Sequence, residues 1–414
     1  MFNKAIDPVC REPYRLFFPF GVWMGVVGIS PWLLYAMGLT KTYSGFFHSS
    51  MLTLVYLNCF IIGFLLTFIP RFTGTFYANR AELFSFLFLF IGIAVFLRQE
   101  QWAAAQMVYL GWLTLLLVFL MRRIPHRKNE GGKPPMELIW IPVAILHAFV
   151  GTMLMLLVHW QIVPPWILKV GRPMMEQGFL MSIVLGIGGF LIPRILGTYQ
   201  AQSSGGCCGG CACSAKKISA TKKAVVFHLI CAGVLFASFW LQGLEWTRLS
   251  YVFQGMVATA EFLWTRTLPK YPRDAGFYGK LSWVSCWMIV VGLWGAAVFP
   301  KYSIEMLHIT FIGGFSLMTF AIATMVVLSH GGEAEQLKKP IWVLWVVLGA
   351  ILFTLFKRLA VIFFPGAFFK MLGIASSAWI IGALVWLIYI FPRLFYIPRE
   401  DEFQKMHKEA GQQH

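Results

Sequence analysis

Long apolar runs separated by short polar gaps limit the fold of this chain more than any other feature. A bilayer core needs about 20 predominantly apolar residues for each helix that crosses it. Runs of roughly that kind lie at 16–37, 45–69, 82–97, 102–121, 138–160, 174–196, 224–243, 249–264, 281–299, 304–328, 340–362 and 366–391. They predict an all-α polytopic membrane protein of about twelve transmembrane helices. The gaps are too short for a soluble domain, so we expect residues 1–414 to form a single transmembrane domain.

The composition excludes the main alternatives to a membrane protein. Hydrophobic residues make up 58% of the chain and charged residues only 12%, whereas soluble domains are about 25% charged. Disorder is excluded because the apolar and aromatic content is too high. The net charge of +17 does not indicate nucleic acid, because the basic residues lie in the gaps between apolar runs. There they set the orientation and contact anionic lipid.

The distribution of basic residues predicts the orientation. With the amino terminus inside, the inner segments contain 25 of the 34 lysines and arginines, and the outer loops contain 9. This asymmetry is what the positive-inside rule requires. We therefore expect both termini in the cytoplasm. The first apolar run begins near Leu16 without a clear cleavage site, so we expect it to stay in the protein as the first helix.

A short motif occurs twice, at an offset of 123 residues without a gap. Its copies are Gly63-x5-Ile69-Pro70-Arg71-x2-Gly74-Thr75 and Gly186-x5-Ile192-Pro193-Arg194-x2-Gly197-Thr198. Because the copies end the second and sixth helices, they predict parallel four-helix repeats. The predicted repeats are 13–121, 136–266 and 281–393, and the third loses the motif near Ser329-His330-Gly331.

Arg71 and Arg194 within these motifs have two interpretations. Each arginine can simply extend to the membrane interface while it meets the carboxyl end of a helix dipole. Alternatively, each can hold an anion such as a heme propionate.

Two histidines are the leading ligand candidates, because ionisable groups inside a membrane are costly. His48 and His308 each lie about one turn into a helix that starts on the outer side. At 1.5 Å per residue their imidazoles would lie at similar depth. Two such imidazoles can ligate heme iron or copper, although each can also bond a backbone carbonyl of a neighbouring helix. The middle repeat has Gly171 where His48 stands.

The remaining membrane histidines are weaker candidates. His147 lies near the middle of its predicted helix, His159 near the outer face, and His228 and His330 near the inner face. Met51 follows His48 on the same helix face and suits copper or heme iron, but packing is its more ordinary role.

A cysteine-rich stretch lies in the predicted cytoplasmic loop 197–223. Its thiols are Cys207, Cys208, Cys211 and Cys213, on a glycine-rich background. Such a loop can wrap Cu(I), zinc or an iron–sulfur species, and a reducing compartment disfavours a disulfide. The alternative is a flexible, lipidated or incidental thiol loop.

Other chemistry has little support. The sequence contains no P-loop and no GxSxG elbow. Membrane carboxylates are few, namely Glu176, Glu261 and Glu305, whereas a proton-coupled transporter would want more acids along its path.

The motifs together resemble the NnrS family of bacterial membrane proteins with about twelve helices. The residues that carry the resemblance are Pro13-Tyr14-Arg15-Leu16-Phe17-Phe18-Pro19, His48, Gly63-Phe64-Leu65-Leu66-Thr67, Ile69-Pro70-Arg71-Phe72-Thr73-Gly74, His308, Gly313-Gly314 and Ser329-His330-Gly331-Gly332.

The resemblance implies heme and copper binding, a bacterial inner-membrane location and a role in the response to nitric oxide. The family's usual motif near the second helix looks like Trp-His-x-His-Glu. Here the matching stretch is Phe46-Phe47-His48-Ser49-Ser50, so one histidine and the acid are absent. The cysteine-rich loop is not part of the family pattern.

Three functions follow from these observations. The first is a heme- and metal-binding membrane protein of the nitric oxide response, with His48 and His308 as ligands. The second is a secondary transporter without a prosthetic group. The third is a subunit like those of heme–copper oxidases, which would need about six histidines and an adjacent His-His pair that this sequence lacks. The residues leave open whether any reaction is catalysed.

Overall fold

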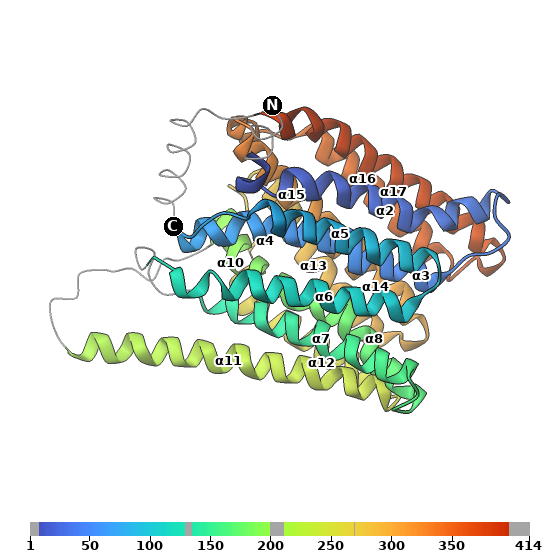
Figure 1. The fold of residues 1–414 in the computed structure, drawn as a ribbon, viewed down its shortest axis with the longest axis horizontal. Coiled ribbons are helices and arrows are strands. Elements are labelled where there is room, and N and C mark those ends of the chain that lie inside the picture. The colour runs from blue at the N-terminus through green and yellow to red at the C-terminus, as the bar shows by residue number, and fades with distance from the viewer. Residues whose placement is uncertain (1–7, 129–134, 199–210, 269, 397–414) are drawn as a thin grey trace.

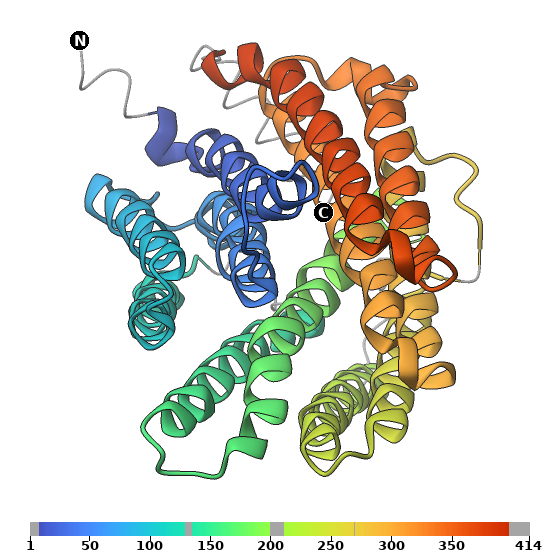
Figure 2. The same ribbon diagram turned by 90° about the vertical axis from the view of Figure 1, so that its right-hand side faces the viewer.

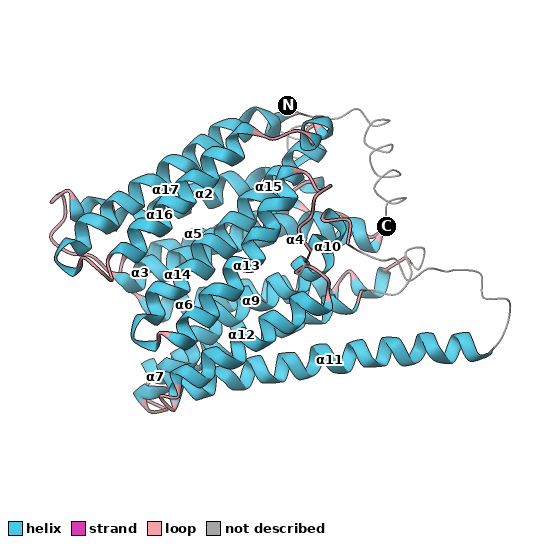
Figure 3. Cartoon of the chain, turned by 180° about the vertical axis from the view of Figure 1, so that it is seen from behind, coloured by secondary structure: helices cyan, strands magenta, loops and turns pink. Residues whose placement is uncertain are grey.

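A computed structural model describes residues 8–128, 135–198, 211–268 and 270–396 (Figure 1). Throughout these ranges the regular structure is helical, as Figure 3 shows. The description of side chains leaves out residues 211–221.

Twelve long helical stretches follow one another in the described chain. The first four are α2 (Tyr14–Ala36), the continuous stretch α3 (Gly45–Ser50), η1 (Met51–Leu57) and α4 (Asn58–Thr73), then α5 (Arg80–Arg98) and α6 (Trp102–Met121). The next four are α7 (Trp140–His159), the stretch α8 (Leu168–Pro173), η6 (Met174–Gly178), α9 (Phe179–Ile183), η7 (Val184–Gly188) and α10 (Gly189–Ile195), then α11 (Cys211–Gly243) and α12 (Thr247–Trp264). The last four are α13 (Phe277–Val298), the stretch α14 (Ser303–His308), η9 (Ile309–Ser316) and α15 (Leu317–His330), then α16 (Trp342–Ala360) and α17 (Phe368–Ile390).

Eleven of these stretches are long and apolar enough to cross a membrane by themselves. The exception is α12, which contains Gln254 and Glu261. The first and last helices nevertheless meet at one end of the bundle, because Arg15 Nη1 donates to the carbonyls of Leu394 and Tyr396, each at 2.7 Å. Ends on one side require an even number of crossings, so α12 completes twelve. The prediction of an all-α polytopic membrane protein is confirmed, and the cytoplasmic placement of the termini stays a prediction.

We call the three sets of four consecutive stretches given above the first, second and third helix groups. Figure 2 shows the helices following one another around a common centre in a view along the bundle. The groups close into a ring, because α6 packs on α7, α12 on α13 and α17 on α2. We call the end at which α2 begins the Glu12 end and the opposite end, at which α3 begins, the His48 end. The predicted division into repeats stays a prediction.

The two copies of the sequence motif adopt the same helix-ending geometry. Gly74 and Gly197 have φ angles of +64° and +68°. The next amide in each copy, that of Thr75 or Thr198, donates to the carbonyl of the motif's proline at 2.9 Å. This is the Schellman ending, in which a left-handed glycine lets the chain turn back and satisfy a free carbonyl.

The same ending occurs where the sequence motif is lost. Gly332 has a φ of +76°, and the amide of Glu333 donates to the carbonyl of Leu328 at 3.1 Å. Only the glycine is needed for this geometry, so the ending survives the loss of the proline and the arginine.

Each of the three stretches that end this way contains π-helical turns. These segments are η1 in the first stretch, η6 and η7 in the second and η9 in the third. A π segment widens the helix by one residue per turn and often lies at functional sites. η1 and η9 begin within three residues of His48 and directly after His308, so both candidate ligands precede a π segment.

The left-handed glycine at the end of α4 gives a first test. Gly74→Ala places a Cβ in a left-handed conformation, which costs roughly 1–2 kcal/mol, so we expect a lower thermal unfolding midpoint in detergent. Gly111→Ala, at an exposed position inside α6, should leave the midpoint unchanged. Equal midpoints for both variants would contradict the proposed role of the Gly74 turn.

Candidate functional site

His48 is fixed by a hydrogen bond to the neighbouring helix. It lies in α3, whose first turn is capped by Ser44 Oγ accepting from the amide of Phe47 at 3.1 Å. The Nδ1 atom of His48 lies 3.0 Å from the carbonyl oxygen of Gly28 in α2. An imidazole that donates from Nδ1 keeps the lone pair on Nε2 for a metal. The side chain is half-buried, so this nitrogen is not sealed inside the bundle.

Gly28 permits this contact because α2 approaches the second helix closely there. A Cβ added at Gly28 would lie 2.9 Å from the Cβ of Met51, which is too close for an ordinary side chain. Met51 itself is fully buried. In the structure it packs against α2 rather than facing an open site, which agrees with the more ordinary of its two interpretations.

His308 lies at the same end of the bundle as His48. Its Nδ1 atom is 2.6 Å from the carbonyl oxygen of Ile304, one turn earlier in α14. It is also half-buried, and its Nε2 lone pair is again the one left for a ligand. The two imidazoles are close enough to interact electrostatically. The structure thus brings together two histidines that are 260 positions apart in the sequence.

A buried arginine lies beside both imidazoles. Arg358, near the end of α16, is only 8% exposed and interacts electrostatically with His48 and with His308. Its Nη1 atom donates to Glu305 Oε1 at 3.3 Å. We call His48, His308, Glu305 and Arg358 the imidazole cluster. Arg358 is not among the residues predicted for the site, although an arginine inside the last turns of an apolar run is a signal for such a role.

A second polar group adjoins His48 and joins the first helix group to the second. Ser49 Oγ donates to Glu176 Oε1 at 3.1 Å and accepts from Arg172 Nη2 at 2.5 Å. Arg172 also donates to Glu176 at 3.3 Å and lies over the ring of Phe46 at 4.7 Å. Glu176 is therefore the counter-ion of Arg172, which gives this membrane carboxylate a structural role.

His147 lies away from the imidazole cluster, inside the second helix group. It is fully buried, and its Nδ1 atom is 2.9 Å from the carbonyl oxygen of Val143 and 3.2 Å from Ser182 Oγ. Its ring packs against Phe236 and Phe239 of α11, at centroid distances of 5.6 and 5.7 Å. Its Nε2 atom is buried without a hydrogen-bond partner. His147 could serve as a ligand only at a site separate from His48 and His308.

The other membrane histidines have different surroundings. His228 forms a buried pair with Glu261, with Nδ1 to carboxylate oxygen distances of 2.9 and 3.0 Å. Glu261 is therefore the buried partner of His228. His159 is exposed at the end of α7.

Arg71 takes part in a buried ionic cluster at the Glu12 end. It donates to Glu12 Oε1 at 2.6 Å and lies 2.8 Å from His330 Nε2. The opposite oxygen of Glu12 accepts from Arg15 Nε at 2.7 Å and from the hydroxyl of Tyr14 at 3.2 Å. We call these five residues the Glu12 cluster. An added anion at Arg71 would have to compete with the carboxylate of Glu12.

Arg194 is engaged differently from Arg71. Its Nη1 atom donates to the carbonyl of Phe190 at 2.5 Å, and its guanidinium lies 3.8 Å from the centroid of the Phe190 ring. The repeated motif therefore conserves the helix ending but not the partners of the arginine.

The predicted soft-metal loop falls outside the described residues. Cys207 and Cys208 lie in the stretch that is not described, and the side chains of Cys211 and Cys213 are likewise left out. Among the described residues, Cys59, Cys231 and Cys286 are free thiols. In the same part of the chain no group of three or more His, Cys, Asp or Glu side chains is placed to hold a metal ion.

Twelve helices, polar clusters at both ends and two converging imidazoles define a multi-pass, all-helical membrane protein. The chain belongs to the NnrS family, because the family model described as NnrS protein matches residues 8–397. The resemblance seen in the sequence is thereby confirmed over nearly the whole chain. No curated protein matches the sequence.

The Glu12 cluster gives a second test, on stability. Burial by itself raises the pKa of Glu12. His330, Arg15 and Arg71 lower this pKa by a larger amount, so the pKa of Glu12 in the folded protein lies below the ordinary 4.5. A depressed folded-state pKa stabilises the protein above the unfolded value, and the stabilisation is lost as the pH falls through the folded value. We expect the thermal midpoint to fall in acid below about pH 4.5, and Glu12→Gln to lower the midpoint at neutral pH and reduce that acid dependence.

The loss of stability expected for Glu12→Gln is large because Glu12 is buried. Removing one partner from a buried ion pair costs about 3 kcal/mol or more. Glu335→Gln is the matched control, because Glu335 is 84% exposed and pairs with an exposed lysine, an interaction worth at most about 1 kcal/mol. Similar losses in both variants, or an unchanged acid dependence in Glu12→Gln, would contradict the assignment.

Proposed function

We propose that this membrane protein binds heme, with copper as a further metal, through His48 and His308, and that it acts in the response to nitric oxide or in protection against it. Two findings support the proposal. Membership of the NnrS family is the first. The second, which carries most weight, is the convergence of the two imidazoles at one end of the bundle.

The residues at hand fit a centre that needs only two protein ligands. The described residues offer no cluster of three or more metal-binding side chains, so a metal held wholly by protein ligands has no support there. A porphyrin supplies four nitrogens of its own, so a heme would need only one or two further ligands from the protein, which His48 and His308 could supply. Cu(I), the softer alternative, also accepts imidazole ligands. Both imidazoles are already oriented by carbonyl oxygens at Nδ1, as ligating histidines commonly are.

Arg358 supplies the charge that such a group would need. Heme carries carboxylates, and a buried guanidinium is well suited to bind them. Arg358 already pairs with Glu305, so a heme carboxylate would have to share Arg358 with Glu305 or displace it. Within the proposal, Arg358 holds the negative groups of the heme while His48 and His308 hold the metal.

A heme or copper centre supplies a metal that binds nitric oxide. The gas is small and uncharged, so it partitions into the bilayer and can reach a site between the helices. Binding or sequestration would suffice for protection, and the proposal requires no turnover.

A visible spectrum tests the ligand assignment. Protein purified in detergent from heme-replete cells should show a Soret band and contain iron. His48→Ala and His308→Ala should each lose the band or shift it strongly, because each removes one of the two imidazoles that would hold the heme or copper. Added imidazole should restore it in part.

His159→Ala is the matched control, since His159 is exposed and lies outside the imidazole cluster. Its spectrum should be that of the wild type. A colourless, metal-free preparation would favour the secondary transporter. An unchanged Soret band in both ligand variants would show that other residues hold the heme.

The cysteine-rich loop has an independent test. We propose that it binds a soft metal, because thiolates at Cys207, Cys208, Cys211 and Cys213 are close in sequence. Replacing all four by serine should reduce the copper or zinc content per chain and leave the Soret band unchanged. An unchanged metal content would eliminate the loop as a site.

A further inference from the structure

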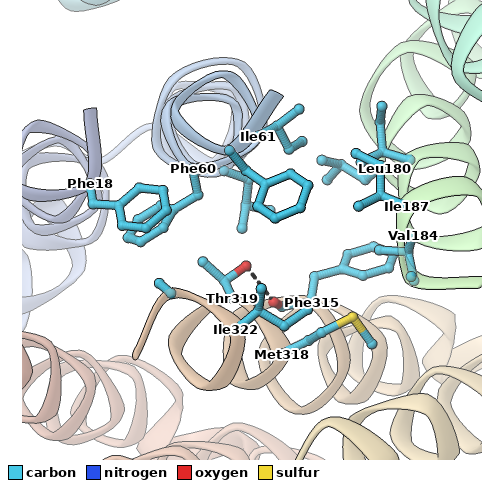
Figure 4. Close-up of a pocket in the computed structure, with 15 residues that line it drawn as sticks. Phe18, Phe60, Ile61, Leu180, Val184, Ile187, Phe315, Met318, Thr319 and Ile322 are labelled. Atoms are coloured by element: carbon cyan, nitrogen blue, oxygen red, sulfur yellow. Dashed lines mark hydrogen bonds between the residues drawn. The ribbon is translucent and has the colours of Figure 1, made fainter. Parts of the chain in front are cut away.

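An apolar cavity lies in the middle of the bundle, between the three central helical stretches (Figure 4). Its volume is about 100 Å³. The walls come from α4 on one side, α9 and η7 on the second, and η9 with α15 on the third. Ile61, Val184 and Met318 represent these three walls, and all three side chains face the same space in Figure 4.

The cavity lies midway between the two polar ends. Leu57, which lines it, is nine residues after His48, and Phe315 is seven residues after His308. These separations correspond to about 10–14 Å along a helix. Towards the Glu12 end, Phe64 is seven residues before Arg71, or about 10 Å. The cavity therefore lies deep in the apolar layer, on the helices that carry the candidate ligands.

The lining is unsuited to water. A buried water needs two to four polar partners, and apolar cavities of comparable size stay dry yet bind xenon or benzene. Among the described residues that line this cavity, Thr319 alone has a hydroxyl or other hydrogen-bonding side-chain group of ordinary strength, and that hydroxyl donates to the carbonyl of Phe315 at 2.7 Å. Figure 4 shows this bond as a dashed line.

The size of the cavity limits the occupant further. About 10–15 Å³ of such space is enough to hold one water molecule. The cavity is therefore ample for a diatomic molecule. An uncharged diatomic gas needs no hydrogen bonds and gains dispersion contacts with the surrounding side chains.

We propose that this cavity is a binding site for a small uncharged gas molecule of the nitric oxide or dioxygen type, from which the gas reaches the imidazole cluster. The site takes its occupant from the bilayer, concentrates it between the central helices and releases it along η1 and η9. Gas binding stands without any prosthetic group. Delivery to a metal at His48 and His308 rests on the proposed function.

Xenon tests the binding site directly, because it binds dry apolar cavities and scatters X-rays anomalously. Crystals of the full-length protein pressurised with xenon should show an anomalous peak bounded by Ile61, Val184 and Met318. Ile322→Phe should abolish the peak by filling the cavity from α15, and Val184→Phe should do so from η7. Ile61→Ala, which enlarges the cavity, should raise the xenon occupancy.

Met325→Phe is the matched control, since Met325 lies one turn further along α15 and does not line the cavity. It should keep the xenon peak, and all variants should elute as monodisperse protein in detergent. The binding site is refuted if the wild type shows no peak, or if the peak persists in both filling variants. Elongated density from a lipid or detergent tail in the cavity would also overturn the proposal.

Delivery is tested by the rate of nitric oxide binding to the heme-loaded protein after flash photolysis. Ile322→Phe and Val184→Phe should slow the rebinding of gas from outside the protein several-fold, while Met325→Phe should not. Loss of xenon with unchanged rates would refute delivery but keep the binding site. Absence of any Soret band would refute the proposed function and delivery together, and the xenon result would still decide the binding site.

Discussion

Pairing of the charged side chains that the described residues bury inside the helix bundle is the constraint on which this structure depends. Lipid offers no hydrogen bonds, so a charge between helices has to find its counter-ion within the protein. Arg123 illustrates the outcome, because it is fully buried and pairs with Glu82 at 3.0 Å. The Glu12 cluster ties the start of α2 to the ends of α4 and α15, and Arg15 adds the end of the last helix. Polar contacts thus stabilise the Glu12 end and the His48 end of the bundle. Apolar packing stabilises the middle.

The sequence predicted only part of the structure of the central helices. The apolar runs predicted the helices, and the repeated Gly-Thr pair marked the ends of α4 and α10. The π segments η1 and η9 had no sequence signal, because they depend on how neighbouring helices pack. α12, predicted from the run at 249–264, is less apolar than the other eleven stretches because it contains Gln254 and Glu261. These residues bond to Gln177 and His228 of neighbouring stretches. Hydropathy counts such residues as if they faced lipid.

The placement of His48 and His308 at one end of the bundle was predictable from the sequence, and their surroundings were not. His48 and His308 stood out because imidazoles are rare inside apolar runs, and helix direction placed them at one level. Arg358 was missed because position in a sequence does not show which face of α16 meets the imidazoles. Arg71 was predicted as a residue that can hold an anion. Its partner Glu12 was not predicted, because Glu12 precedes the first apolar run. Contacts between distant segments decided both cases, and no local pattern encodes them.

The polar His48 end and the apolar middle of the bundle, the two levels considered next, favour different ligands because they differ in polarity. A metal centre with charged side groups needs a cation such as Arg358 and some access to polar surroundings, which the His48 end provides. An uncharged gas needs neither and is retained best where no polar group competes for space, which is the middle of the bundle. The stretches α3–η1–α4 and α14–η9–α15 run through both levels. In each stretch a π segment lies between the histidine and the cavity. Because these segments lie where the two levels meet, they are the elements whose packing would set how freely a small molecule passes between the levels in the proposed delivery.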